Sequence, residues 1–232
     1  GPITQVDLDA SSRERAAFLA VRFRLDPVEI TDTFAERDAI MHGHSGFKDI
    51  ELWFEHDLYD QLQLVQVLAF LADARRTQGV RLVQADDFLG AQRADTILRF
   101  AEHARDVTEA DLGLARAIWG DLAMPTPEFV AGRSEMPAGP LPFLRNALTR
   151  FLEELPAPEN GLGRTEQAIL TGIRAGTGNP SRLFQVVLEQ EEAAFMGDLS
   201  FFRLIEDLAF CAVPLITGVV EPAAPAGFDD AH

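Results

Sequence analysis

The 232-residue sequence is poor in cysteine and in lysine, since Cys211 and Lys48 are the only residues of these two kinds. A lone cysteine excludes an internal disulfide and fits the reducing cytosol, so we predict a cytoplasmic protein. Cys211 lies in the apolar run Leu208–Val213. We therefore expect a thiol that is buried in a core and is not a nucleophile.

The sequence also lacks long apolar runs and the common catalytic and nucleotide-binding motifs. No run approaches the roughly 20 apolar residues of a membrane span, and no secretory leader is visible. The motifs GxxxxGKS/T, GxGxxG after a strand, CxxC, HExxH and GxSxG are all absent. Membrane proteins, the common nucleotide-binding proteins, zinc proteases and serine hydrolases are therefore without support.

Basic side chains are scarce relative to acidic ones. The chain has 37 acidic and 20 basic residues, and its formal net charge is −17. Most non-specific affinity for nucleic acids comes from neutralising phosphates, and no basic stripe offsets the negative charge. Anionic membrane surfaces are disfavoured for the same reason. The expected partners are a small molecule or another protein.

What the sequence does contain is a strand–helix–strand pattern between residues 49 and 83. Ile50–Phe54 is short, β-branched and aromatic, as is typical of a buried strand. From Leu58 the apolar residues change to helical spacing, and Val80–Val83 is a second short apolar run. This order predicts a right-handed βαβ unit. We therefore expect a helix-rich α/β protein with a small, mainly parallel sheet.

Three polar residues, Glu55, His56 and Asp57, follow the first predicted strand. In open α/β sheets, ligands bind beyond the carboxyl ends of the strands, so these residues and Asp86, after the second strand, are expected at one rim. An imidazole among carboxylates can act as a general acid or base, or can help to hold a divalent metal ion. We predict His56 and Glu55 as catalytic residues, and Asp57 and Asp86 as metal ligands.

Structural explanations exist for the same residues. Asp57 is well placed as the N-cap of the helix, and Asp60 would then be an acidic residue of its first turn. Asp86 also fits an ordinary turn. Arg15, in an earlier predicted helix, could bind an anionic ligand near the acidic rim or could be a solvated helix charge. Arg15 and Asp60 are the predicted ligand-binding residues, and the structural explanation stays open for each.

The thirteen residues Leu52–Leu64 read LWFEHDLYDQLQL. They resemble the signature of a bacterial family known as domain of unknown function 1835, and weaker similarities extend over most of the chain. The resemblance implies a fold of the α/β kind but no activity, because the family has no established one. In that family a Gly-Pro pair follows an N-terminal strand–helix portion. The resemblance therefore implies that such a portion is missing before Gly1 and Pro2.

Stretches rich in proline and glycine divide the chain. We predict an α/β domain over residues 1–122, a helical connector over 123–156, a C-terminal module over 157–220 and a disordered tail over 221–232. Three short helices and a β-prone hairpin at 212–220 make the C-terminal module winged-helix-like. This module contains four arginines and eight acidic residues. We therefore expect its third helix to pack on the first domain or to bind a protein, and not to read DNA.

Two functional hypotheses follow. The first is an enzyme that uses a divalent metal ion at the strand ends for hydrolysis or phosphoryl transfer on a small substrate. The second is a non-catalytic regulatory protein, in which the same residues cap helices and the C-terminal module binds a protein partner. A nucleic-acid regulator ranks third because of the charge. Convergence of Glu55, His56 and an aspartate from another loop in one pocket would favour the enzyme.

Overall fold

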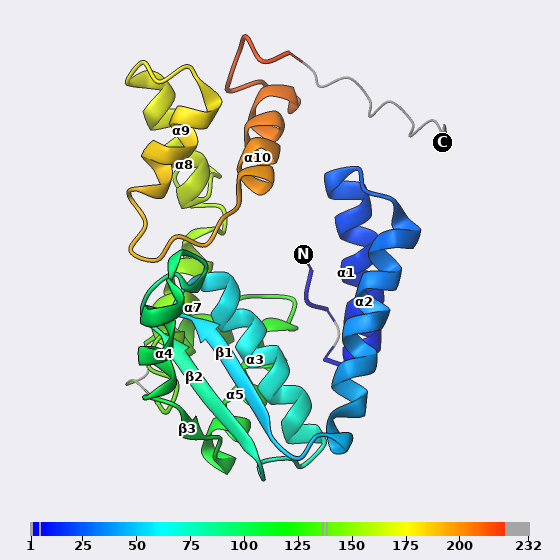
Figure 1. Cartoon of the computed structure of the whole chain (residues 1–232). Helices are drawn as coiled ribbons and strands as arrows, with labels where there is room; N and C mark the ends of the chain where they lie inside the picture. Colours follow the sequence, from blue (N-terminus) through cyan, green and yellow to red (C-terminus); the bar gives the residue numbers. More distant parts are fainter. Residues whose placement is uncertain (1, 5, 136, 138, 221–232) are drawn as a thin grey trace, which may run out of the picture.

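The computed structural model describes residues 2–4, 6–135, 137 and 139–220. It contains a small sheet packed against helices, a helical hairpin along one side, and a cluster of three helices that lies above the sheet in the view of Figure 1. The helix-rich α/β architecture predicted from the sequence is confirmed. No helix within the described ranges is long and apolar enough to cross a membrane.

The sheet has three strands in the order β1-β2-β3. β1 (Ile50–Glu55) and β2 (Val80–Ala85) pair in parallel, and α3 (Leu58–Asp73) connects them. This is the predicted βαβ unit. β3 (Arg105–Asp106) adds two residues that pair antiparallel to β2. The sequence pattern did not predict this third strand, because two residues are too few to show an alternation of apolar and polar side chains.

The main hydrophobic core lies between the sheet and the helices α3, α5 (Glu109–Leu122), α6 (Glu128–Ser134) and α7 (Leu144–Glu153). The helices of the predicted connector thus contribute to the core of the first domain. Burial of this apolar surface is the dominant stabilising contribution to the fold. Its buried members are Leu64, Val65, Leu68, Ala69, Leu71, Val80, Leu82, Val107, Leu112, Ala115, Ile118, Trp119, Leu122, Val130, Leu141, Leu144 and Leu148.

The opposite face of the sheet is covered by α4 (Ala94–Ala101) and by the 3₁₀ turn Leu89–Ala91. Val83 and Ala85 of β2 form a small buried cluster with Phe100 of α4. Because α4 is short, this cluster is much smaller than the main core. The loop that follows β2 lies close to the end of β1, where the predicted site lies, because the amide of Leu89 donates to Glu55.

α1 (Leu8–Phe23) and α2 (Pro27–His42) form the hairpin along the side of the molecule (Figure 1). The 3₁₀ turn Gly43–Gly46 leads from this hairpin to β1. The segment before α1 contacts the main core through a hydrogen bond from Nε1 of Trp119 on α5 to the carbonyl oxygen of Val6 (3.2 Å). The position of α1 decides where a cavity forms, as described below.

The C-terminal module has a core of its own, built by α8 (Arg164–Arg174), α9 (Pro180–Leu188) and α10 (Asp198–Phe210). The three predicted helices are confirmed. The predicted hairpin at 212–220 is wrong, because the described residues there contain no strand. Pro214 in this segment has no backbone N–H to donate to a ladder, which disfavours a paired strand.

Cys211 is exposed, and the expectation of a buried thiol is wrong. The reason is local: α10 ends at Phe210, and the backbone at Cys211 is extended, with φ −70° and ψ 169°. The side chain therefore leaves the buried face of the helix. The predicted disordered tail, residues 221–232, lies outside the described residues.

Candidate functional site

The turn between β1 and α3 has the predicted conformation. The chain leaves β1 at Glu55 and enters α3 at Leu58. Asp57 is the N-cap of α3, and its Oδ1 accepts hydrogen bonds from the backbone amides of Tyr59 (2.8 Å) and Asp60 (3.1 Å). These bonds satisfy two of the amides that a helix start leaves without a partner. The structural explanation for Asp57 is thus observed.

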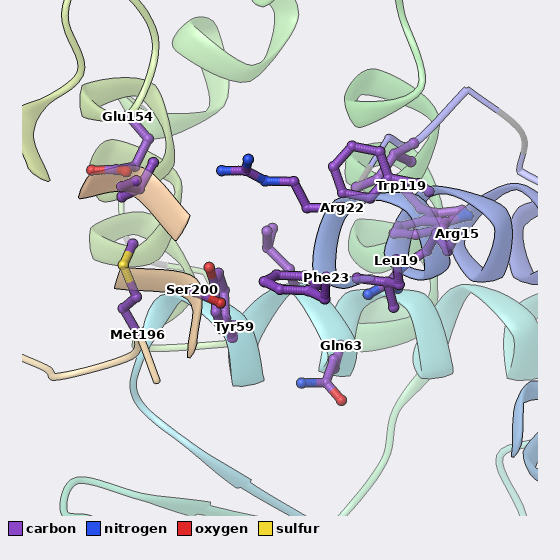
Figure 2. Close-up of a pocket in the computed structure, with 14 residues that line it drawn as sticks. Arg15, Leu19, Arg22, Phe23, Tyr59, Gln63, Trp119, Glu154, Met196 and Ser200 are labelled. Carbon is purple, nitrogen blue, oxygen red and sulfur yellow. The ribbon is translucent and has the colours of Figure 1, made fainter. Parts of the chain in front are cut away.

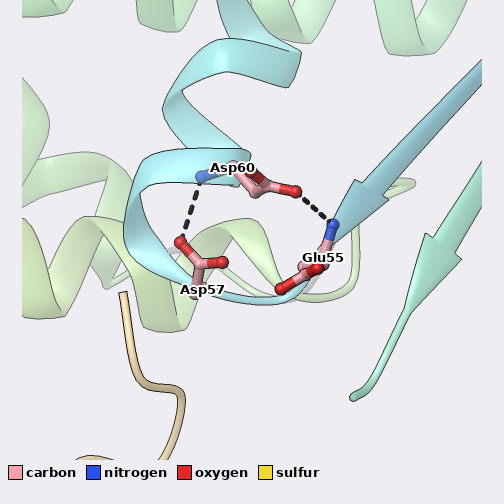
Figure 3. Close-up of side chains that lie close together, drawn as sticks. All are labelled: Glu55, Asp57 and Asp60. Atoms are coloured by element: carbon pink, nitrogen blue, oxygen red, sulfur yellow. Dashed lines mark hydrogen bonds between the residues drawn. The ribbon is translucent and has the colours of Figure 1, made fainter. Parts of the chain in front are cut away.

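The two neighbouring acids are also bound by backbone amides. Oδ2 of Asp60 accepts from the amide of Glu55 (2.6 Å), as Figure 3 shows. Oε1 of Glu55 accepts from the amide of Leu89 (2.8 Å). The fully buried Gln61 donates from Nε2 to the carbonyl oxygen of Glu55 (2.6 Å) and accepts from Nε2 of Gln84 (3.3 Å). All these bonds hold the turn in one conformation, so each acid has a structural role.

Glu55, Asp57 and Asp60, which we call the acidic cluster, each offer a carboxylate oxygen, and these oxygens lie within 4.8 Å of one another. Within the described ranges, no other three His, Cys, Asp or Glu side chains are grouped in this way. Desolvation raises the pKa of Glu55 and of Asp57, and neighbouring carboxylates add to the rise. A divalent cation would offset this repulsion, so the acidic cluster could hold a metal ion.

His56 lines a different cavity, of about 270 Å³, together with Arg145 and Thr149 of α7. Its ring packs edge-on against the ring of Phe143, with 5.8 Å between the centroids. In the described part of the chain, its buried Nδ1 has no hydrogen-bond partner. The acidic cluster does not line this cavity. The predicted acid–base histidine and the predicted metal ligands therefore face different surroundings.

Asp86 does not join the acidic cluster. It lines another cavity together with Asp87. The loop after β2 approaches the end of β1 through the backbone amide of Leu89, which donates to Glu55, and not through the side chain of Asp86. The predicted pairing of Asp86 with Asp57 as metal ligands is therefore not formed.

Arg15 has no hydrogen bond or ion pair with the acidic cluster, so its predicted place at the acidic rim is not observed. It lies on α1 and lines a cavity of about 370 Å³ between α1, α3 and α10. Figure 2 shows Arg15 and Trp119 at one end of this cavity, and Met196 and Ser200 at the other. The lining is mostly apolar, and its residues are Ile3, Arg15, Phe18, Leu19, Arg22, Phe23, Tyr59, Leu62, Gln63, Trp119, Glu154, Met196, Ser200 and Leu204.

The guanidinium of Arg15 has no carboxylate partner among the described residues. Its one hydrogen bond there runs from Nη1 to Oε1 of Gln66 (3.3 Å). Nε of Arg15 and Nε2 of Gln66 are both buried without an acceptor. Desolvation lowers the pKa of Arg15, and the nearby charge of Arg37 lowers it further. Arg15 is thus a partly buried cation whose charge is not neutralised, which is an unfavourable arrangement in the absence of a partner.

The other charged side chains that line this cavity are matched. Arg22 donates to both carboxylate oxygens of Asp207 on α10, with 2.7 Å between Nη1 and Oδ1. Glu154 accepts a hydrogen bond from Arg150 (2.7 Å). Of the charged groups in the described wall, only Arg15 therefore lacks an ion pair.

Side chains of α10, the third helix of the C-terminal module, contact the hairpin. Ser200 lines the cavity, Asp207 pairs with Arg22, and Glu206 lies 3.8 Å from Arg24. The third helix of the C-terminal module is thus turned towards the hairpin.

Sequence reasoning did not identify the cavity residues Tyr59 and Ser200 or the adjacent Gln66. Gln66 had a usable signal, because it is the one polar residue in the run Leu64–Leu71, and it is only 6% exposed. Buried amides are almost always hydrogen-bonded, so a glutamine among core residues indicates a polar contact. Tyr59 and Ser200 gave no such signal, because they occupy ordinary positions on helical surfaces.

Comparisons with protein-family models, with curated proteins and with solved structures give a uniform result. No family model matches the chain, and no curated protein and no solved structure matches it. The resemblance to domain of unknown function 1835 therefore stays a prediction. Function has to be inferred from the geometry of the molecule itself.

Proposed function

We propose that the protein binds a small molecule in the cavity between α1, α3 and α10. One observation carries the proposal: segments far apart in the sequence surround about 370 Å³ with mostly apolar side chains and a few polar groups. Pockets for small molecules typically have volumes of about 300–1,000 Å³ and this kind of lining. The proposal keeps the small-molecule partner expected from the sequence and moves its site away from the strand ends.

The cavity lies where the hairpin meets the C-terminal module, which gives a ligand a route of entry. The ion pairs between these two parts are Arg22 with Asp207 and Arg24 with Glu206. Partly exposed ion pairs of this kind contribute about 0–1 kcal/mol each. The two walls can therefore adjust around a ligand at little cost in free energy.

A matched pair of variants tests the proposal. Ser200→Trp fills the cavity from α10, whereas Leu199→Trp places the same side chain on an exposed position next to it. Small organic acids, bases and neutral molecules are screened by their effect on the melting temperature. We expect a stabilising compound at about 100 times its Kd to add about 2.7 kcal/mol to the wild type and to Leu199→Trp but not to Ser200→Trp.

Equal shifts in all three proteins would show that the compound binds elsewhere and would contradict the proposal. So would the absence of any stabilising compound among acids, bases and neutral molecules of suitable size. Circular dichroism spectra of both tryptophan variants control for misfolding. If Ser200→Trp does not fold, Leu204→Trp provides a second way to fill the same cavity from α10.

The second candidate is metal-assisted hydrolysis or phosphoryl transfer at the acidic cluster, with Glu55 as the acid–base group. One specific observation favours it, namely the three carboxylate oxygens that lie within 4.8 Å of one another. Two or three carboxylates at this spacing suit Mg²⁺ or Mn²⁺. The ion would lower the free energy of charges that desolvation and mutual repulsion now disfavour.

This candidate is tested with the metal ions alone. Mg²⁺ and Mn²⁺ are titrated by calorimetry into the wild type and into Glu55→Gln/Asp60→Asn, which keeps the oxygens that accept from the backbone. Glu51→Gln removes a charge from the same strand outside the acidic cluster and serves as the control. Binding that the double variant loses and the control keeps supports the metal site. Absence of binding to the wild type removes the candidate.

A further inference from the structure

We infer that the ligand of the cavity is an organic carboxylate with an apolar body, and that Arg15 binds its carboxylate group. This inference rests on the proposed function, because it assigns a chemical class to the ligand of the same cavity. Four features of the described residues lead to it: the missing acceptor of Arg15, its charge without a partner, the composition of the wall, and the absence of a free carboxylate for a cationic ligand.

The first feature is the lack of an acceptor for Arg15, which lines the cavity. Nε of Arg15 is buried without an acceptor, and Nη1 makes one 3.3 Å bond to Oε1 of Gln66, which does not line this cavity. Leaving a buried donor without an acceptor costs roughly 1–3 kcal/mol, so an acceptor is missing beside the guanidinium. A carboxylate has two oxygens in the spacing that a guanidinium can bind by two parallel hydrogen bonds.

The second feature is the charge around Arg15. The charged group that acts on it is Arg37, which has the same sign and is itself paired with Asp38 (2.7 Å). Both cations lie near the ring of Phe34, whose centroid is 4.8 Å from Cζ of Arg37 and 6.0 Å from Cζ of Arg15. In these surroundings an anion gains more than a neutral acceptor, because it neutralises the charge as well as accepting the hydrogen bond.

The third feature is the remainder of the wall. Leu19 and Phe23 of α1, Leu62 of α3 and Leu204 of α10 line the same cavity as Arg15. Burial of apolar ligand surface against such side chains contributes about 25 cal/mol per Å². A ligand that joins one anionic group to an aromatic or aliphatic body matches both parts of the cavity.

The fourth feature excludes other ligand classes. Glu154 is the one carboxylate in the described wall, and Arg150 and Thr165 already bind it. A cationic ligand therefore finds no free anion. A phosphate carries up to two negative charges, whereas a single unpaired guanidinium faces the cavity, because Arg22 is paired with Asp207. A carboxylate, with one charge, is the better match.

Gln66 acts here as a positioning residue. Its Oε1 holds Nη1 of Arg15, and its backbone sits on α3 inside the main core, where Gln66 is 6% exposed. The guanidinium is thereby kept in one orientation before the ligand arrives. Preorganisation of this kind reduces the entropy lost on binding.

The test uses 4-phenylbutyrate as the probe and its neutral amide, 4-phenylbutyramide, as the matched comparison. Both are titrated by calorimetry into the wild type, Arg15→Met and Arg13→Met. Arg13 is an exposed arginine of the same helix that does not line the cavity, so it controls for loss of charge. We expect the acid to bind the wild type about 10-fold to 100-fold more tightly than the amide, because a hydrogen bond between two charged groups contributes more binding free energy than one to a neutral amide.

In Arg15→Met the acid and the amide are expected to bind equally, whereas Arg13→Met keeps the preference for the acid. Equal binding of both probes to the wild type, abolished by Ser200→Trp, would overturn the carboxylate assignment and leave the proposed function in place. Absence of binding by this acid and by octanoate and indole-3-acetate at millimolar concentration would also overturn the assignment. If Arg15→Met does not fold, Arg15→Gln is measured instead and has to show the same loss of preference.

Discussion

Arg150 and Arg15 are both partly withdrawn from solvent, and their surroundings differ in kind. Arg150 on α7 is 9% exposed and donates hydrogen bonds to Glu154, to both carboxylate oxygens of Glu191 and to the hydroxyl of Thr165. Burial by itself lowers the pKa of Arg150, but the hydrogen bonds to the two carboxylates outweigh it, and the pKa is raised. For Arg15 desolvation dominates, and the pKa is lowered.

The difference separates a structural cation from a cation that is available to a ligand. Arg150 joins α7 to the start of α8 and to the segment before α10, so it connects the first domain to the C-terminal module. Its guanidinium is held in place by the carboxylates of Glu154 and Glu191. Arg15 faces a cavity instead, and its donors are not used up. The four predictions below test this contrast, beginning with the largest effect.

Arg150→Met is expected to destabilise the protein by about 3–5 kcal/mol. Removing the guanidinium leaves Glu191, whose side chain is 9% exposed, with the longer 3.8 Å contact to Arg164 as its ion pair within the described residues. Breaking one side of a buried ion pair typically has a cost of this size. Urea unfolding followed by circular dichroism at neutral pH measures the change in the free energy of unfolding.

A double variant sharpens this prediction. Arg150→Met/Glu191→Gln removes the buried charge of Glu191 as well, so part of the lost stability should return. A loss below about 1 kcal/mol for Arg150→Met alone, in the range of exposed ion pairs, would mean that the two arginine regions do not differ as described.

Asp57→Ala is expected to destabilise the protein by about 0.5–2 kcal/mol, and Asp57→Asn by a few tenths at most. The turn between β1 and α3 resembles the Arg150 region in that its charged groups already have partners within the protein, here the backbone amides that donate to its acids. Asparagine keeps the oxygen that accepts from Tyr59 and Asp60, and alanine does not. The measurement is urea unfolding without added metal ions. A neutral or stabilising Asp57→Ala would show that Asp57 is not needed as a cap.

The strand–helix–strand unit could be predicted from the sequence because its signals are local. The change from strand spacing to helical spacing occurs within a few residues of Asp57, and the N-cap itself is a side chain with a fixed preference. The positions of β1, α3 and β2 follow from such patterns. Three residues predicted in separate roles, Glu55, Asp57 and Asp60, lie together at this turn, whereas the predicted metal ligand Asp86 does not join them.

The cavity could not be predicted in the same way, because it depends on contacts between distant segments. Arg15 and Gln66 are 51 residues apart, and nothing in their neighbours' spacing shows that α1 lies against α3. The same holds for Ser200, which reaches the cavity only because α10 turns towards the hairpin. A side chain such as Arg15 is recognised because it is buried and lacks a hydrogen-bond or ion-pair partner. That is a property of the folded chain and not of a sequence motif.

Glu55→Gln is expected to stabilise the protein at pH 7 by a few tenths to about 1 kcal/mol, after allowance for screening by solvent. Desolvation raises the pKa of Glu55 in the folded state. Between the unfolded and the folded pKa the folded state binds more protons, so stability falls as the pH rises through this window. Glutamine removes that loss and keeps the oxygen that accepts from Leu89.

The gain from Glu55→Gln should therefore disappear as the pH falls below the unfolded pKa of about 4.3. Urea unfolding of the variant and the wild type at a series of pH values measures it, with Glu51→Gln as the control for loss of a charge from β1. A gain at pH 7 no larger than that of the control would argue against desolvation of the acidic cluster.

Arg15→Met is expected to change the free energy of unfolding by about 1 kcal/mol or less, the smallest effect of the four. The variant loses one weak hydrogen bond to Gln66, but it also removes a partly buried charge that has no carboxylate partner. The two contributions have opposite signs and similar size. Methionine replaces the aliphatic stem of the arginine, although the contact of the guanidinium with the ring of Phe34, 6.0 Å from Cζ to the centroid, is lost. Urea unfolding of this variant beside Arg150→Met compares the two regions directly. If both losses are equally large, Arg15 stabilises the fold as Arg150 does, and its lack of a partner no longer indicates a ligand.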